Sequence, residues 1–149
     1  MKLIATIVTL CLCTITSFAQ QSLDLKIKQG SDKPNSEKEH LYLLEINNSS
    51  RSTTNFTIST ANVNCSNMSA EKQTDLIHRA LNRTSRGELT SYSIQPNTNF
   101  EFYIKISRPD NISIGKWNCT EVKAIDENGK TISNSVIITS LIPDPNDQH

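Results

Sequence analysis

The chain has few aromatic residues, few glycines and no excess of charge of either sign. Aromatic residues make up 5% of its 149 residues, glycine occurs 4 times, and Lys plus Arg equals Asp plus Glu at 15 each. A neutral chain lacks the basic surface by which proteins bind nucleic acid, and no polybasic stretch suits an anionic membrane. The sequence contains no Gly-x-Ser-x-Gly elbow, phosphate-binding loop or dinucleotide fingerprint. The length allows one domain or two very small ones, and it excludes a large enzyme.

The one long apolar run lies at the N-terminus, and we interpret residues 1–19 as a secretory signal peptide. Lys2 supplies the positive charge, and the small residues Ser17 and Ala19 precede a cleavage site before Gln20. The run is too short for a hydrocarbon core of roughly 30 Å. The sequence therefore predicts a secreted or periplasmic chain, cleaved after Ala19, with no membrane span.

Two alternatives remain for this segment. It could be a buried N-terminal helix, or a lipoprotein signal cut at Cys11 or Cys13. The lipoprotein reading lacks the small residues that such a cut needs before the cysteine. The signal peptide is preferred.

Cleavage would leave two cysteines, Cys65 and Cys119, in an oxidising compartment. Such a pair predicts one disulfide, closing a loop of about 55 residues and stabilising the fold by roughly 4 kcal/mol in the chain-entropy account. The alternative is two unpaired thiols, because the sequence does not give the distance between the two Cα atoms.

Most of the chain alternates apolar and polar residues with the period of a half-buried strand. The segment 100–106 is the clearest, with Phe100, Phe102, Ile104 and Ile106 on one face. Strands are expected at residues 23–28, 41–46, 55–60, 90–94, 100–106, 116–125 and 131–141.

Other features refine these strands. Tyr42, Leu44 and Ile46 are expected to share the core face of the second strand, and Phe56 and Ile58 that of the third.

A change of face between Cys119 and Val122 suggests a bulge in the segment 116–125. Residues 126–129, Asp-Glu-Asn-Gly, predict a tight hairpin, because Asn-Gly tolerates positive φ.

Residues 69–83 break the alternation. On a helical wheel Leu76, Ile77 and Leu81 share an apolar face, while Asp75, His78 and Arg79 lie on the polar side. Ser69 is a plausible N-cap. We therefore expect one helix of about three turns here.

About seven short strands with one inserted helix predict a mainly β fold, an antiparallel immunoglobulin-like β-sandwich. The expected organisation is a signal peptide at 1–19, the sandwich at 20–141 and a flexible tail at 142–149. Pro143 and Pro145 suit the end of the ordered chain.

Four stretches carry a family resemblance. Residues 92–96, 100–106, 115–119 and 122–129 resemble the last four strands of a bacterial immunoglobulin-like or fibronectin type III-like domain. The signal segment resembles those of secreted proteins of Bacteroidetes. The resemblance implies an adhesion, binding or spacer module and carries over no catalytic residue. The helix at 69–83 and Cys65, which follows the third strand, depart from the pattern, so the disulfide of antibody domains is no guide here.

No catalytic or metal constellation stands out. His40, His78 and His149 are scattered without cysteine or carboxylate at ligand spacing, which argues for surface histidines over a zinc site. Glu101 and Glu121 lie on separate predicted strands. We favour cross-strand pairing of these residues with Lys105 or Lys123 over the paired carboxylates of a glycosidase. We predict no cofactor and no metal, and residues 126–129 lack the spacing of a calcium loop.

Asn-x-Ser/Thr sequons are dense. They would mean heavy glycosylation in a eukaryotic secreted protein, or else a by-product of high Asn, Ser and Thr content, which we prefer. They begin at Asn47, Asn48, Asn55, Asn64, Asn67, Asn82, Asn111 and Asn118.

Tyr103 lies on the polar face of the best strand and is the candidate partner-binding residue, because exposed aromatics stack on sugars or anchor proteins. Trp117, beside Cys119, is expected in the core. The favoured function is a binding or adhesion module for an unknown protein or glycan. The alternatives are a small or accessory enzyme with its site on 69–83, or a self-assembling structural subunit.

Overall fold

The strongest alternation of the sequence forms the central strand β6 (Thr98–Ser107). The side chains of Phe102, Ile104 and Ile106 are fully buried, whereas Tyr103 and Lys105 between them are half-buried on the opposite face. Successive side chains of a strand point to opposite faces, so this one strand contributes to the core and to an outer surface.

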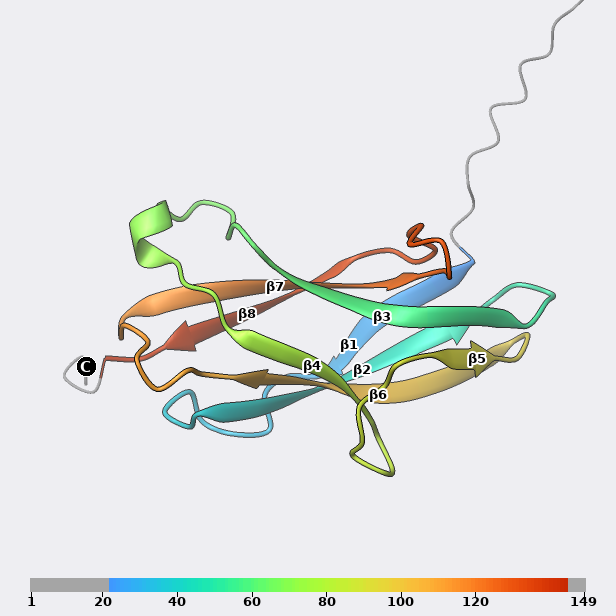
Figure 1. The fold of residues 1–149 in the computed structure, drawn as a ribbon, viewed down its shortest axis with the longest axis horizontal. Helices are drawn as coiled ribbons and strands as arrows, with labels where there is room; N and C mark the ends of the chain where they lie inside the picture. The colour runs from blue at the N-terminus through green and yellow to red at the C-terminus, as the bar shows by residue number, and fades with distance from the viewer. Residues whose placement is uncertain (1–21, 145–149) are drawn as a thin grey trace, which may run out of the picture.

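The computed structural model describes residues 22–144 and shows two antiparallel sheets packed face to face (Figure 1). The first sheet has the order β1-β2-β6-β4 and the second β5-β3-β7-β8. The other elements are β1 (Leu23–Gln29), β2 (Glu39–Asn48), β3 (Thr54–Val63), a 3-10 turn η1 (Ala70–Lys72), β4 (Ile77–Asn82), β5 (Tyr92–Ile94), β7 (Lys116–Ile125) and β8 (Val136–Ile142).

The core fills the space between the two sheets. Each buried side chain of this size contributes roughly 1.5–3 kcal/mol by leaving water. The core residues include Leu23, Leu25, Tyr42, Leu44, Ile46, Phe56, Ile58, Ile94, Phe102, Ile104, Ile106, Val122, Ala124, Ile138 and Ile142. The predicted fold class is confirmed, as are the inward faces of the second, third and 100–106 strands.

The predicted helix over 69–83 is wrong. Only η1 is helical, and β4 pairs antiparallel with β6 from Ile77↔Ser107 to Asn82↔Phe102. Leu76 is buried as expected, but Ile77 is 50% exposed and Leu81 is only half-buried.

The physical reason is the open edge of β6. A short isolated helix is marginal in water, whereas a strand laid on β6 satisfies the backbone groups of both segments. The apolar residues Ile77 and Leu81, four positions apart, fit the helical pattern, but they also share one face of a strand.

The predicted bulge in β7 is also wrong. The register runs unbroken from Val63↔Cys119 to Thr57↔Ile125 on one side, and β8 pairs in step on the other. Asn118 and Thr120 therefore face the interior in line with Val122, and Cys119 faces the other way. Because Asn118 and Thr120 are polar residues at interior positions, the apolar–polar alternation of this strand could not be recognised from the sequence.

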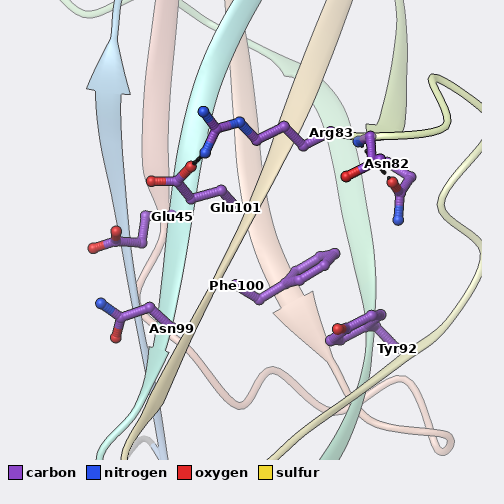
Figure 2. A pocket seen from close by; sticks show the side chains of 8 residues that line it. Glu45, Asn82, Arg83, Tyr92, Asn99, Phe100 and Glu101 are labelled. Atoms are coloured by element: carbon purple, nitrogen blue, oxygen red, sulfur yellow. Dashed lines mark hydrogen bonds and ion pairs between the residues drawn. The ribbon is translucent and has the colours of Figure 1, made fainter.

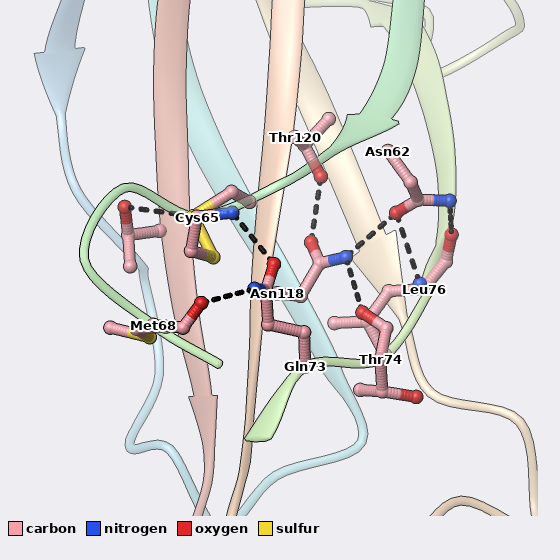
Figure 3. Close-up of a disulfide and its surroundings, with 10 residues drawn as sticks. Asn62, Cys65, Met68, Gln73, Thr74, Leu76, Asn118 and Thr120 are labelled. Carbon is pink, nitrogen blue, oxygen red and sulfur yellow. Dashed lines mark hydrogen bonds between the residues drawn. A yellow bond between two sulfur atoms is a disulfide. The ribbon is translucent and has the colours of Figure 1, made fainter. Parts of the chain in front are cut away.

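Cys65 and Cys119 form a disulfide, as predicted, with their Cα atoms 5.3 Å apart. Cys65 follows β3 and Cys119 lies on the adjacent strand β7, so the bond joins neighbours within one sheet. It fastens the loop after β3 to that sheet (Figure 3). Trp117, expected in the core, is only half-buried beside this loop, and its carbonyl accepts a hydrogen bond from the Thr74 N–H.

The hairpin at 126–129 is confirmed. The Asp126 N–H donates to the Lys130 carbonyl, and Gly129 has φ +77°, a conformation that favours glycine. The Asp126 carboxylate accepts from the N–H groups of Asn128 and Lys130, each at 2.9 Å. These bonds within the turn hold the carboxylate in the manner of a plain hairpin.

No helix within residues 22–144 is long and apolar enough to cross a membrane. The predicted signal peptide, 1–19, lies outside the described residues. Of the predicted tail only residues 142–144 are described, and Ile142 is the buried last residue of β8.

Two isoleucine-to-alanine substitutions test whether residues 77–82 form a strand or a helix. Ile104→Ala should lower the free energy of unfolding by about 2–5 kcal/mol, because it opens a cavity in the core. Ile77→Ala should change it by less than about 0.5 kcal/mol, because the side chain is exposed on a strand. Urea unfolding measures both, and a large loss for Ile77→Ala would contradict the position of β4.

Candidate functional site

The outer face of the β1-β2-β6-β4 sheet carries an apolar row across its centre. Cross-strand register places Leu43 of β2 and Leu81 of β4 on either side of Tyr103 of β6. All three side chains are half-buried, although they lie on the solvent side of the sheet. The predicted partner-binding residue Tyr103 is therefore the middle of a contiguous apolar strip.

Arg86 covers this strip from one side. Its guanidinium carbon lies 4.2 Å from the centroid of the Tyr103 ring, a cation–π contact worth about 0.5–1 kcal/mol at an exposed site. Arg86 has a left-handed backbone (φ 59°), and its N–H donates to the Asn82 carbonyl at 3.0 Å. The tight turn after β4 thus holds the arginine over the tyrosine.

An ion-paired rim borders the strip. Glu45 is 5% exposed, and its two oxygens pair with Lys26 at 2.7 Å and Lys28 at 3.0 Å. Lys28 also pairs with Glu101, which pairs in turn with Arg83. The hydrogen bond from Lys26, and then that from Lys28, keep the pKa of Glu45 below its usual range.

The two carboxylates of this rim would repel one another without the cations. Glu45 and Glu101 are directly opposite in register on β2 and β6. Like charges in that position destabilise a sheet, and Lys28 between them offsets the repulsion. The rim therefore has both charges in place before any ligand arrives.

Glu101 and Glu121, which the sequence offered as a carboxylate pair, lie on different sheets. Glu121 on β7 pairs with Lys123, two residues further along the same strand, at 2.8 Å, and this contact lowers the pKa of Glu121. Lys105, the expected partner of Glu101, pairs with Glu39 instead at 2.6 Å. The predicted cross-strand pairs are therefore wrong: Glu121 has a lysine partner, but within its own strand, and Glu101 pairs with Lys28 and Arg83.

A notch opens beside this rim, at the end of β4 (Figure 2). Its volume is about 650 Å³. It is lined by Glu45, Asn82, Arg83, Thr84, Tyr92, Asn99, Phe100 and Glu101. Tyr92 and Phe100 present aromatic rings, and the other six residues are polar or charged.

The histidines are not all on the surface. His40 is 3% exposed, its Nδ1 lies 2.7 Å from Ser31 Oγ, and its Nε2 lies 2.9 Å from the Glu37 carbonyl. The expectation of a surface His40 is therefore wrong. Its two ring nitrogens contact residues of the β1–β2 loop and so stabilise that loop.

His78 is half-buried, although the helical wheel placed it in water. It points from β4 into the space between the sheets, where Nδ1 lies 2.7 Å from Thr60 Oγ1. Burial lowers its pKa. Residues 22–144 contain no group of three His, Cys, Asp or Glu side chains placed to hold a metal, and His149 lies outside them.

Several sequon asparagines have structural roles. Asn118 is 1% exposed, and its amide donates to Asn62 Oδ1 at 2.7 Å and to the Thr74 carbonyl at 2.9 Å (Figure 3). Asn48 is fully buried and donates to the carbonyls of Ser52 and Ile94. A glycan on either residue would require this packing to open. The exposed sequon asparagines are Asn55, Asn64, Asn67 and Asn111.

The sequence predicted the outward position of Tyr103 but not the residues around it. Glu45, Leu43, Leu81 and Arg86 owe their positions to cross-strand register and to the turn after β4. The one available signal was alternation, which puts Leu43 and Glu45 opposite the core-facing Leu44. Because Leu81 was predicted to lie on the buried face of a helix, its position on the outer face of a sheet was not predicted.

No protein-family model matches the chain, and no curated protein matches it. Among solved structures, a FixG-related protein from Vibrio parahaemolyticus is 9% identical with a TM-score of 0.47, over 82% of this chain and 94% of that one. The apo PmoF2 PCuAC domain is 9% identical with a TM-score of 0.43, over 86% and 94%. PapD-like domain 7 of human CEP192, an ASH domain, is 8% identical with a TM-score of 0.44, over 93% and 98%. These β-rich neighbours are likenesses of fold and assign no ligand or activity to the chain.

Stability should depend on the protonation of His78. Its folded pKa lies below the ordinary 6.5, so the unfolded chain binds the proton better. The stability is complete above about pH 6.5 and falls as the pH drops below it. Urea unfolding should show a lower midpoint at pH 5.5 than at pH 7.5, and His78→Gln should reduce that difference. An unchanged difference in the variant would assign the effect to other groups.

Proposed function

We propose that the domain is a non-catalytic binding module that engages its partner through the outer face of the β1-β2-β6-β4 sheet, with Tyr103 at the centre. The observation that carries the proposal is the strip of Leu43, Tyr103 and Leu81, covered by Arg86. Tyrosine and arginine are the residue types that most often dominate binding energies at interfaces.

The arrangement of charge supports binding over catalysis. A general acid at neutral pH needs a raised carboxyl pKa, whereas the lysines around Glu45 lower its pKa. The charges of the rim are already paired, so a partner meets an apolar centre with a polar border. That composition is typical of a protein interface.

Export is part of the proposal. The disulfide between Cys65 and Cys119 is of the kind that persists in oxidising compartments, and it fits an extracellular or periplasmic protein. The predicted signal peptide at residues 1–19 supplies the route. The alternative of an enzyme with its site on 69–83 gains no support, because His78 turns inward to Thr60 and Asp75 is exposed.

Substitution of Tyr103 tests whether the outer face of the β1-β2-β6-β4 sheet binds the partner. The purified protein would be screened against immobilised cell-surface proteins, and each partner found would be titrated with variants. Tyr103→Ser should weaken binding at least tenfold, because it removes the centre of the strip. Ile114→Ser, at a residue 48% exposed in the loop before β7, is the matched control and should bind as the wild type does. A protein partner that binds Tyr103→Ser unchanged would contradict the proposal.

Strand β8 favours self-assembly as a second candidate. It lies at a sheet edge, its seven residues carry no charge, and Ile137 is 47% exposed. An uncharged edge strand can pair with another chain. By contrast, backbone hydrogen bonds from Leu89 and Asn82 link β4 to the segment 87–89.

Under this second candidate, sedimentation should show a dimer whose fraction rises with protein concentration. Ile137→Lys should shift the protein to monomer, because a charged side chain on an edge strand opposes pairing with another chain. A wild type that remains monomeric at every concentration would remove the candidate.

A further inference from the structure

The notch exists because β4 is shorter than the strand it pairs with. β4 ends at Asn82, opposite Phe102, whereas β6 begins four residues earlier at Thr98. β5 does not fill the gap, since it pairs with β3 in the other sheet. Residues 98–101 of β6 therefore have a strand neighbour only on the β2 side, and the notch lies along their open edge.

One wall of the notch is a fixed pair of aromatic rings. Tyr92 and Phe100 stack with centroids 3.7 Å apart and planes 19° apart. Phe56 lies behind both, at 6.0 Å from Tyr92 and 6.4 Å from Phe100. Tyr92 is still 37% exposed. The rings are thus held in place before a ligand binds, which reduces the entropy lost on binding.

The opposite border is formed by planar polar groups. Arg83 pairs with Glu101, yet its side chain is 54% exposed, so other guanidinium N–H groups still reach solvent. Asn82 Oδ1 accepts from the N–H groups of Thr84 and Ser85, which leaves its amide nitrogen as a donor. In Figure 2, Glu101 with Arg83 and the aromatic pair lie on different sides of the space.

We propose that this notch binds a saccharide, with a pyranose ring against the exposed ring of Tyr92, which Phe100 supports by stacking on its other face. Its hydroxyls would be hydrogen-bonded by Arg83, Asn82 and Glu101. A pyranose has a C–H face, which packs against the electron-rich face of an aromatic ring, and a rim of hydroxyls that both donate and accept. The volume of about 650 Å³ is ample for one or two sugar rings.

Other ligand classes fit less well. The cations Lys28 and Arg83 are already paired with Glu45 and Glu101, so they hold little free charge for a phosphate. An added peptide strand would find four uncovered residues on β6, too few for a stable ladder. Six of the eight lining residues are polar or charged, which disfavours a lipid or another apolar ligand.

The inference rests on the proposed function in one respect, that the domain binds through this side of the first sheet. It adds a ligand class and a set of residues that do not include Tyr103. Variants at Tyr92 and Arg83 therefore test the notch, and Tyr103→Ser tests the central strip separately.

The experiment uses the full chain purified after export. A glycan array would be followed by saturation-transfer NMR with methyl glycosides of glucose, galactose, mannose and N-acetylglucosamine, and with any oligosaccharide that the array retains. We expect at least one sugar to receive transfer at its ring C–H protons. Tyr92→Ala and Arg83→Gln should each weaken it at least fivefold, and Tyr103→Ser should leave the affinity within twofold.

The absence of binding by any saccharide would overturn the inference, as would binding that Tyr92→Ala and Arg83→Gln leave unchanged. Loss of saccharide binding in Tyr103→Ser alone would also overturn it and would place the sugar on the central strip. Thermal unfolding and a two-dimensional NMR spectrum check that each variant folds. If Tyr92→Ala fails this check, Arg83→Gln decides, because its side chain is exposed and outside the core.

Discussion

The ladder of hydrogen bonds along β6 is the constraint on which the rest of the structure depends. The strand pairs with β2 over ten residues and with β4 over six. The side chains of Phe102, Ile104 and Ile106 fill the core, and the odd-numbered ones between them form the middle of the outer face. A shift of one residue in its register would exchange the two sets, so burial of Phe102, Ile104 and Ile106 also decides where Tyr103 points.

The same ladder explains the rim and the notch. Register puts Glu45 opposite Glu101, and the resulting repulsion is offset by Lys28 from the next strand, β1. The difference in length between β4 and β6 leaves residues 98–101 uncovered. The rim and the notch thus follow from strand pairing together with the turn after β4, which supplies Arg83 and Thr84.

At the end of the sandwich near the disulfide, polar contacts in place of apolar packing stabilise the loop after β3. Asn118, Thr120 and Asn62 meet between the sheets, and each makes hydrogen bonds there. Gln73 binds the Cys65 N–H through Oε1 at 2.7 Å and the Met68 carbonyl through Nε2 at 2.9 Å. Buried amides without such partners would be costly, so this network and the disulfide stabilise the loop together.

Alternation, turn chemistry and cysteine count determined much of the protein from the sequence alone. They predicted the mainly β sandwich, the inward faces of three strands, the hairpin at 126–129, the Cys65–Cys119 bond and the outward Tyr103. These features depend on local periodicity or on residue chemistry, which the sequence contains directly.

The tertiary structure decided what depends on a distant strand. Residues 77–82 became β4 because the edge of β6 offered backbone partners, and the apolar spacing of Ile77 and Leu81 satisfied both a helix and a strand. Asn118 and Thr120 entered the interior because their hydrogen-bond partners come from elsewhere in the chain or from each other. The contact of Arg86 with Tyr103 likewise depends on two segments that are brought together by the fold, and so does the notch beside Phe100. A local sequence pattern does not predict such contacts.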